Sequence, residues 1–281
     1  MSSTKPVAFI TGASRGIGAA TAVALAHAGY DLAITARSLE EGEQHEHGSW
    51  QSQTAPIAGS LKTTAAQAEA AGAQCLSLRS DILDPDSVLA AIDDTLTHYG
   101  RIDCLFNNAC YQGPGNLQRL LDVTADQVKS IYQGNVLTPL LTVQKVLPGM
   151  LERGQGAVIN MVSGSAVNNP PAPADEGGWG FAYPSSKAAL IRMVPSLRVE
   201  HPDAGLRFFN VEPGFVYTEV MRANGFGEEV AARFKPNAPE DIAAVVRWLA
   251  TAEDALAYHD KTIIFAPQLL EKLGEEIARE A

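Results

Sequence analysis

A short apolar run, followed at once by a glycine-rich turn and an alanine-rich helical segment, restricts the fold of this chain most. Residues 7–10 lead into Thr-Gly-Ala-Ser-Arg-Gly-Ile-Gly, which places glycines at positions 12, 16 and 18. Glycine lets a backbone turn sharply and approach a phosphate, while the N-terminus of the next helix offers free N–H groups and a partial positive charge. The pattern favours a dinucleotide-binding unit, although a plain tight turn between strand and helix is the alternative.

Six further apolar runs extend this unit into a larger sheet. They cover residues 32–35, 74–78, 103–106, 157–162, 206–211 and 262–265, and helical patterns separate them. Regular alternation of strands and helices is typical of a parallel sheet covered by helices on both faces. We therefore expect an α/β, doubly wound (Rossmann) sheet of about seven mainly parallel strands in a single domain over residues 1–281.

Local signals mark the helix ends and two interruptions. Glycines at 29, 72 and 100 end helical stretches, prolines at 85 and 239 begin them, and Thr124 with Gln127 has the pattern of a capping box. The polar residues 41–60 and the proline- and glycine-rich residues 164–180 break the alternation. We interpret both as surface insertions, where specificity tends to lie.

Composition limits the partners and the compartment. A net charge of -11 disfavours nucleic acid and anionic membranes as partners, while leaving room for a local basic pocket. The three cysteines are too few and too widely spaced for a disulfide framework, which indicates a reducing, cytoplasmic setting. Neither a signal peptide nor an 18-residue apolar stretch is evident, so we expect no membrane segment.

The end of the second expected strand bears on the choice of cofactor. An NAD site usually has a carboxylate there, but this chain has Thr35-Ala36-Arg37-Ser38. Arg15 and Arg37 are able to converge on a 2′-phosphate, which favours NADP(H) over NAD(H), unless either arginine is only a solvated surface residue. Asp81 follows the third strand and could bind the adenine amino group or cap a helix.

A tyrosine and a lysine four residues apart suggest the chemistry. Tyr183 and Lys187 open a helical pattern and so share one helix face, which brings an ammonium near a phenol. A nearby positive charge favours phenolate, so we expect the pKa of Tyr183 to move toward neutrality. Ser163, at the end of the fifth strand, is suited to hold a substrate oxygen, and Ser165 is the second choice. The four-residue spacing alone is weak, since it also occurs by chance on helix surfaces.

In order and spacing together, these motifs resemble the short-chain dehydrogenase/reductase family, in its shorter, single-domain branch, over nearly the whole chain. They are Thr11-Gly-x-x-x-Gly-x-Gly18, Asn107-Asn108-Ala109, Asn135, Ser163, Tyr183-x-x-x-Lys187 and Pro213-Gly214-x-x-x-Thr218. The resemblance implies a nicotinamide cofactor, a small-molecule carbonyl or alcohol substrate, and a homodimer or homotetramer.

The resemblance also implies a role for each matching residue. Tyr183 would be the general acid/base, Lys187 would lower its pKa and hold the nicotinamide ribose, and Ser163 would orient the substrate. Asn135 would anchor a water of a proton relay, unless it is an ordinary polar residue of a helix. The cofactor would contact Gly12, Ser14, Arg15, Gly16, Ile17, Gly18, Arg37, Asp81, Ile82, Asn108, Ala109, Tyr183, Lys187, Pro213, Gly214, Val216 and Thr218.

Taken together, the residues predict an oxidoreductase that transfers a hydride between NADP(H) and a carbonyl or alcohol. Residues 217–235, with Met221, Phe226 and Phe234, are interpreted as a lid, unless these apolar residues belong to the core. Trp179 with Phe181 is interpreted as an apolar wall, and both segments suggest an uncharged, apolar substrate. The alternatives are an NADP(H)-binding regulatory or scaffold protein without catalysis, and a non-redox lyase or epimerase on the same scaffold.

Several positions depart from the family pattern. Cys110 replaces a usual glycine, and we favour a packing role over a reactive thiol. Twenty residues separate Ser163 from Tyr183, a long interval that predicts a loop over the substrate, and the C-terminal part lacks the Asp-Gly-Gly of many relatives. His45-x-His47 has no supporting ligands nearby, so we expect a solvated loop and no metal site.

Overall fold

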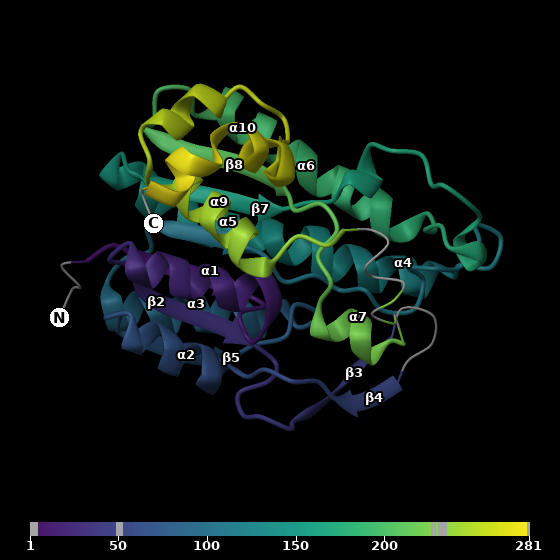
Figure 1. Cartoon of the computed structure of the whole chain (residues 1–281). Helices are drawn as coiled ribbons and strands as arrows, with labels where there is room; N and C mark the ends of the chain where they lie inside the picture. The colour runs from purple at the N-terminus through teal and green to yellow at the C-terminus, as the bar shows by residue number, and fades with distance from the viewer. Residues whose placement is uncertain (1–4, 49–52, 226, 228, 230–234, 280–281) are drawn as a thin grey trace.

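The central strands are apolar on both sides, and the sheet that they form is covered on both faces. The computed structural model describes residues 5–48, 53–225, 227, 229 and 235–279. Its main sheet has the order β5-β2-β1-β6-β7-β8-β9, and every pairing is parallel (Figure 1). The strands are β1 Val7–Thr11, β2 Asp31–Ala36, β5 Cys75–Arg79, β6 Cys104–Asn107, β7 Gly156–Met161, β8 Leu206–Glu212 and β9 Ile264–Phe265. The expected doubly wound sheet is confirmed, with each strand within two residues of its predicted range.

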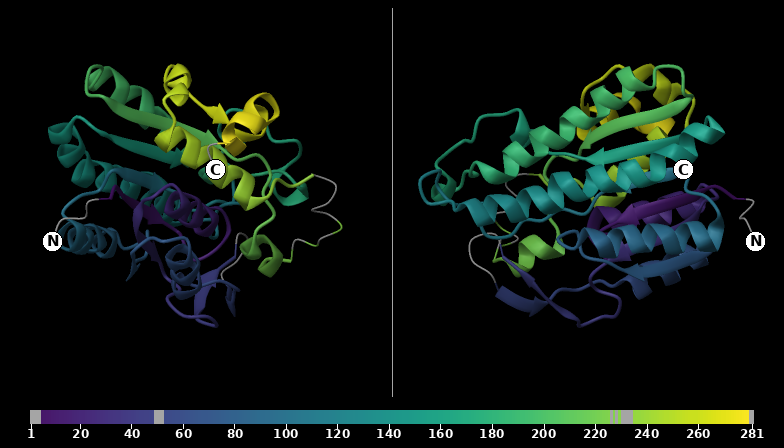
Figure 2. Two further views of the ribbon diagram at one scale, coloured as in Figure 1. Left: turned by 60° about the vertical axis from the view of Figure 1, so that its left-hand side comes forward. Right: turned by 180° about the vertical axis from the view of Figure 1, so that it is seen from behind.

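Helices pack on both faces because successive strand residues point to opposite sides. Ala8 and Ile10 of β1 belong to the core cluster formed with α1, α2, α9 and α10, whereas Val7 and Phe9 belong to the cluster formed with α3, α5 and α6 (Figures 1 and 2). The helices are α1 Gly16–His27, α2 Leu61–Ala70, α3 Pro85–Tyr99, α4 Ala125–Tyr132, α5 Thr138–Arg153, α6 Ala182–Glu200, α7 Glu219–Ala223, α9 Pro239–Thr251 and α10 Ala266–Arg279.

Local chemistry sets the helix ends as expected. Gly100 ends α3 in the left-handed conformation, with φ 77°, which a residue with a side chain adopts only at a cost. The capping box of α4 is formed, since Gln127 N donates to Thr124 Oγ1 at 3.3 Å and Thr124 N donates to Gln127 Oε1 at 2.9 Å. These ends orient the helices relative to the sheet.

The strand order reverses between β1 and β6, because β2 and β5 lie on one side and β7 to β9 on the other. In open α/β sheets the loops at the carboxyl ends of the strands separate at such a point and leave a crevice for a ligand. The carboxyl ends of β1, β2, β5, β6, β7 and β8 therefore define where a site is to be sought.

The insertion at residues 41–60 contains a second, two-stranded sheet. β3 (Gln44–His47) pairs antiparallel with β4 (Gln53–Pro56), and this hairpin lies at the same end of the molecule as α7 in every view (Figures 1 and 2). The sequence analysis anticipated an insertion but no strands. Polar residues on both faces of β3 hide the alternation that normally identifies a strand. The other insertion, 164–180, contains only two short 3-10 turns, Gly164–Ala166 and Ala174–Glu176, as its prolines require.

A row of three buried asparagines joins β6, β7 and β8. Asn107 pairs in register with Asn160, and Asn160 pairs with Asn210. Asn107 Nδ2 donates to Asn160 Oδ1 at 3.0 Å, and Asn160 Nδ2 donates to Asn210 Oδ1 at 3.4 Å. Thr142 of α5 donates to Asn107 Oδ1 at 2.9 Å. This polar row crosses an otherwise apolar core just below the carboxyl ends of the strands.

We expect Asn160→Leu to lower the free energy of unfolding by about 2–4 kcal/mol. The change leaves a donor of Asn107 and an acceptor of Asn210 buried without their partner, and unmet buried polar groups are costly. Urea denaturation measures the loss, and Thr142→Val, which removes a single bond at the end of the row, serves as the milder comparison. A loss below about 1 kcal/mol for Asn160→Leu would contradict this account of the row.

Candidate active site

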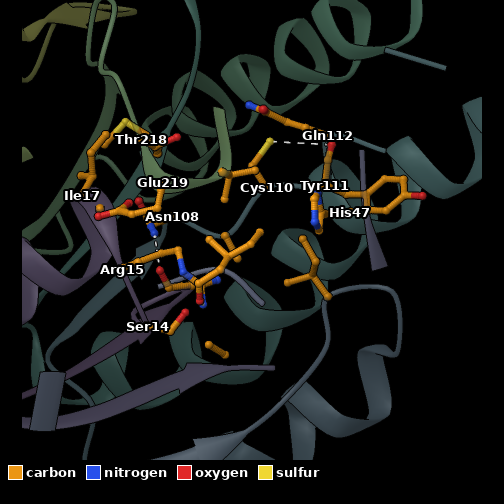
Figure 3. Close-up of a pocket in the computed structure, with 18 of the residues that line it drawn as sticks. Ser14, Arg15, Ile17, His47, Asn108, Cys110, Tyr111, Gln112, Thr218 and Glu219 are labelled. Atoms are coloured by element: carbon orange, nitrogen blue, oxygen red, sulfur yellow. Dashed lines mark hydrogen bonds between the residues drawn. The ribbon is translucent and has the colours of Figure 1, made fainter. Parts of the chain in front are cut away.

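One large pocket lies at the carboxyl edge of the sheet. It is lined by the turn after β1, the ends of β2 and β5, the chain after β6, the end of β7, α6, the chain from β8 into α7, and the β3–β4 hairpin. Figure 3 shows Ser14, Asn108, Cys110 and Thr218 facing it from different elements. The catalytic and cofactor residues expected from the sequence line this pocket, except for Gly18 and Asn135, which lie behind its surface.

Tight packing explains two of the three glycines in the turn after β1. A Cβ on Gly12 would approach Ala109 Cα to 2.8 Å, and one on Gly18 would approach Gly12 O to 2.3 Å. A Cβ on Gly16 would make only ordinary contacts, with Thr218 Cγ2 at 3.7 Å and Glu219 Oε2 at 3.8 Å, but its φ of 55° favours glycine. Gly12 and Gly18 thus allow close packing of the turn, and Gly16 allows its left-handed backbone.

The chain after β6 holds this turn in place. Asn108 Nδ2 donates to the carbonyls of Thr11 and Gly12 at 3.0 and 3.1 Å. The hydroxyl of Thr11 in turn accepts the N–H groups of Asn108 and Ala109 at 3.1 and 3.0 Å. Asn108 therefore supports the turn after β1.

The residues of the turn fit a dinucleotide pyrophosphate. α1 begins at Gly16, and within the described residues no side chain caps its N-terminus. Uncapped N–H groups of a first helical turn that faces a pocket are suited to bind an anion. Glu219 lines the same region, and its buried Oε2 lies 3.8 Å from the Cβ position of Gly16.

At the adenosine end, the structure separates the two arginines. The Arg15 guanidinium donates to the carbonyls of residues 57, 58 and 59 at 3.0, 2.8 and 2.7 Å, and to Ser38 Oγ at 3.2 Å. Most of the N–H groups of Arg15 thus hold the chain after the hairpin. This corrects the expectation that Arg15 and Arg37 are equally available to bind a 2′-phosphate. Arg37 lines the pocket, and its guanidinium makes no hydrogen bond or ion pair with any residue in the described ranges.

Asp81 and Ile82, at the end of β5, also line the pocket. Asp81 Oδ1 accepts the N–H of Leu83 at 2.9 Å, whereas Asp84 occupies the position before α3. Asp81 is therefore not the helix cap that was the alternative interpretation. Its Oδ2 makes no hydrogen bond within the described residues.

The Tyr183 hydroxyl lies within hydrogen-bonding reach of three side chains: Ser163, Gln112 and Cys110. Ser163 and Ser165 are themselves paired, with 3.0 Å between their hydroxyl oxygens. Ser163, the first choice, is thus the serine beside the phenol. Gln112 was missed because nothing in its local pattern marks it, and only the chain after β6 carries it to Tyr183.

Burial raises the pKa of Tyr183, and the nearby Cys110 acts in the same direction, while hydrogen bonds from Ser163 and Gln112 lower it. The expected shift toward neutrality is not found, because removal of the phenolate from water outweighs the favourable contacts. Cys110 is half-buried at the phenol, so the residue assigned to packing also lines the reacting end of the pocket.

Lys187 is 2% exposed and follows Tyr183 by one helical turn of α6. Its Nζ lies 5.9 Å from the centre of the Tyr183 ring and donates to Met161 O, at the end of β7, at 2.8 Å. A lysine is seldom buried so deeply without a specific role. The helix thus fixes an ammonium below the phenol, as the four-residue spacing predicted.

Asn135 belongs to a π-helical segment, Gln133–Leu137, between α4 and α5. Its side chain accepts from Tyr111 N at 2.7 Å and donates to Tyr111 O at 3.1 Å and to Ser186 Oγ at 3.2 Å. Single π-helical turns often mark functional positions. Asn135 therefore joins the chain after β6 to α6, which is more than an ordinary polar residue of a helix does.

Glu212, the last residue of β8, is a further site residue that the sequence analysis missed. Its Oε1 accepts Gly164 N at 3.2 Å and its Oε2 accepts Gly214 N at 2.9 Å. One carboxylate thus connects the loop after Ser163 with the Pro213-Gly214 turn. Burial raises the pKa of Glu212, although both backbone bonds act against the shift.

This raised pKa predicts a pH dependence of stability relative to Glu212→Gln. The unfolded carboxyl ionises first as pH rises, so the unfolded chain binds fewer protons and wild-type stability falls. We expect wild type to lose free energy of unfolding, relative to the variant, from about pH 4.5 up through the folded pKa and then to remain level. Denaturation curves of both proteins at several pH values measure it; a difference that grows in favour of wild type would refute the prediction.

The chain after β8 reaches the pocket with Pro213, Gly214, Val216 and Thr218. Thr218 also caps α7, since its Oγ1 accepts Met221 N at 3.4 Å. Met221 lines the pocket, whereas Phe226 and Phe234 of the expected lid lie outside the described residues. Of the expected lid, residues 218–221 line the pocket.

Two expectations about the insertions are corrected. Trp179 and Phe181 line a separate hollow with Pro170 and Leu120, and not the pocket of Tyr183, because the 164–180 segment folds beside the site. His47, expected in a solvated loop, is 9% exposed and lines the main pocket.

Over the described ranges, no group of three or more histidine, cysteine or carboxylate side chains is arranged to hold a metal ion. Within the same residues, no helix has both the length and the apolar character needed to cross a membrane.

Comparisons with known proteins agree with this geometry. Residues 6–229 match the sequence model of the family described as short chain dehydrogenase. A 3-oxoacyl-[acyl-carrier-protein] reductase from Synechocystis sp. is 30% identical over 259 residues, which are 91% of this chain and 92% of the relative. A metagenomic short-chain oxidoreductase solved with NADP is 28% identical, with a TM-score of 0.67 and coverage of 89% and 92%. A 3-oxoacyl-[acyl-carrier protein] reductase from Brucella melitensis, solved with NAD, is 26% identical, with a TM-score of 0.73 and coverage of 94% and 96%.

Proposed function

Because this chain belongs to the short-chain dehydrogenase family of NAD(P)-dependent oxidoreductases, we propose that it interconverts a carbonyl and an alcohol with NADP(H). The substrate is a small, uncharged and largely apolar molecule, and Tyr183 is the general acid/base. The observation that carries the proposal is the Tyr183 hydroxyl, which lies beside Ser163 and one helical turn from the Lys187 ammonium.

The protein's part in the reaction is the transfer of a proton at the substrate oxygen. When bound, the nicotinamide ring supplies or accepts the hydride. Ser163 donates a hydrogen bond to the substrate carbonyl oxygen, and the Tyr183 hydroxyl delivers the proton to that oxygen. Burial raises the pKa of Tyr183, which favours the neutral phenol, the form that can donate this proton.

Lys187 and Asn135 position these groups. The buried ammonium of Lys187 stabilises the phenolate that remains after proton transfer, and it is the group best placed to bind the nicotinamide ribose. Asn135 fixes Tyr111 and Ser186, and thereby the chain after β6 against α6. Its role in a proton relay follows from the family resemblance.

Preference for NADP(H) is supported by charge at the end of β2. Arg37 lines the pocket at the position where a carboxylate would bind the ribose hydroxyls of NAD, and a guanidinium suits a 2′-phosphate. Asp81 with Ile82 forms the neighbouring adenine surface. Arg15 contributes mainly by fastening the chain after the hairpin.

An apolar substrate is supported by the lining near Tyr183. Met161, Val162, Phe215, Val216 and Met221 present carbon and sulfur atoms to the same pocket. Gln112 and Cys110 are the polar exceptions, and both lie at the phenol. The substrate is therefore expected to carry its polar atoms at the reacting end.

The test is oxidation of NADPH by the purified chain against a diverse panel of ketones and aldehydes. We expect stoichiometric consumption of NADPH with at least one apolar carbonyl compound. Tight NADPH binding without turnover on the whole panel would favour a non-catalytic regulatory or scaffold protein. Product formation without net NADPH consumption would favour a lyase or epimerase.

A further inference from the structure

The inserted hairpin turns one of its faces toward the pocket. His45 and His47 lie on one side of β3, because side chains alternate across a strand, and both line the pocket together with Glu43, Ala55 and Ile57. Glu46 and Gly48 also line it. The neighbouring Gln44 is exposed. The insertion thus adds a wall that the central sheet does not supply.

This wall is fastened at both ends. On one side, the Arg79 guanidinium, at the end of β5, donates to both oxygens of Glu43 at 2.7 and 3.0 Å. On the other, Arg15 donates to the carbonyls of residues 57, 58 and 59. Because both ends are tied to loops of the main sheet, the hairpin has a defined position over the pocket.

The two histidines on the inner face differ in their partners. His45 Nε2 lies 3.2 Å from Glu43 Oε2, so this ring nitrogen has a hydrogen-bond partner next to the hairpin. His47 is 9% exposed, and neither of its ring nitrogens has a hydrogen-bond partner in the part of the chain that the structure describes. Buried polar atoms are nearly always bonded in folded proteins. An unbonded, buried imidazole in a pocket wall indicates a group that a ligand completes.

The electrostatic surroundings show which half of the pocket this is. Burial raises the pKa of Tyr111, Glu46 and Asp81 act in the same direction, and Arg37 acts in the opposite one. The geometry agrees with this assignment, because Arg79, which pairs in register with Ala36 at the end of β2, binds Glu43 at the start of the hairpin. The hairpin therefore begins beside the ends of β2 and β5. Figure 3 shows His47 and Tyr111 among the residues of the same pocket. Arg37 and Asp81 are the residues assigned above to the adenosine.

We propose that His47 binds the adenosine half of the dinucleotide, an inference that rests on the proposed function. One ring nitrogen donates a hydrogen bond and the other accepts one, or both donate when the ring is protonated. The adenine edge and the 2′-phosphate are the polar groups of that half which such a ring matches. His47 thereby replaces the donors that Arg15 uses to hold the loop, and the hairpin becomes part of the cofactor site.

The test compares dinucleotide binding by wild type, His47→Phe and His47→Gln. His47→Phe keeps a ring without nitrogens, and we expect it to weaken NADPH binding about tenfold, as expected for loss of a buried hydrogen bond. His47→Gln retains one donor and one acceptor and is expected to keep part of the affinity. Gln44→Ala, on the exposed face of the same strand, is the matched control and should bind as wild type does. Isothermal titration calorimetry measures all four without any substrate.

Cofactor fragments identify the group that His47 binds. Equal losses for 2′,5′-ADP and 5′-AMP assign His47 to the adenine or its ribose, and a loss for 2′,5′-ADP alone assigns it to the 2′-phosphate; either result supports the proposal. Unchanged affinity of His47→Phe, or a loss confined to nicotinamide mononucleotide, overturns it while the proposed function stands. Failure of wild type to bind either NADPH or NADH overturns both.

Thermal unfolding separates ligand binding from a structural role. Without cofactor, His47→Phe should be at least as stable as wild type, because it removes two buried nitrogens that have no partner. Its stabilisation by added NADPH should nevertheless be smaller, in line with the weaker binding. A variant that is clearly less stable without cofactor, yet gains the full stabilisation from NADPH, would contradict the proposal.

Discussion

Replacing Tyr183 by phenylalanine is expected to lower kcat for carbonyl reduction by about a thousandfold, with NADPH affinity nearly unchanged. The reason is chemical: the variant keeps the ring buried in α6 but loses the hydroxyl that delivers a proton to the substrate oxygen. General acid catalysis typically contributes a factor of about 10²–10⁴. Steady-state kinetics and NADPH titration of the same preparation measure the two quantities.

Two further variants make this result interpretable. Tyr132→Phe, which removes a hydroxyl at the end of α4 outside the pocket, should keep the wild-type rate. Ser163→Ala should also lose activity, whereas Ser165→Ala should lose less, because Ser163 is the serine beside the phenol. Full activity of Tyr183→Phe would exclude the proposed mechanism.

Arg37→Asp should raise the Kd for NADPH by about a hundredfold and change that for NADH by only a few-fold. The variant removes a guanidinium suited to a phosphate and introduces a carboxylate that repels it, while the same carboxylate can bind ribose hydroxyls. Fluorescence titration with both cofactors measures the ratio.

The variant Lys129→Asp shows whether a change in net charge alone alters cofactor affinity. This side chain is 77% exposed on α4, outside the pocket, and the substitution changes the net charge by the same amount. It should leave both affinities unchanged. Equal losses of NADPH and NADH binding in Arg37→Asp would remove Arg37 from the 2′-phosphate site.

Features that depend on residues close together in the chain could be predicted from the sequence. The glycine spacing at residues 12–18 could be recognised within one strand, one turn and one helix, although the contact of Gly12 with Ala109 appears only in the fold. Tyr183 and Lys187 share a face because of helix periodicity. The strands of the main sheet were found because buried parallel strands are continuous apolar runs. The β3–β4 hairpin was missed because its residues are polar on both faces.

Roles that depend on contacts between distant segments required the tertiary structure. The sequence favoured Arg15 and Arg37 equally, but only the fold brings residues 57–59 to Arg15 and occupies most of its donors. Gln112 reaches Tyr183, and Glu212 joins two loops, across many residues of chain. The pKa of Tyr183 also depends on burial by the whole site, which the nearby ammonium does not overcome.

The sequence by itself thus determined the sheet, the glycine turn after β1 and the tyrosine–lysine pair, because backbone geometry and periodicity act over a few residues. The tertiary structure alone decided which arginine is available, which histidine is buried without a partner and what surrounds the phenol. Hydrogen-bond partners and burial depend on segments that meet only after folding.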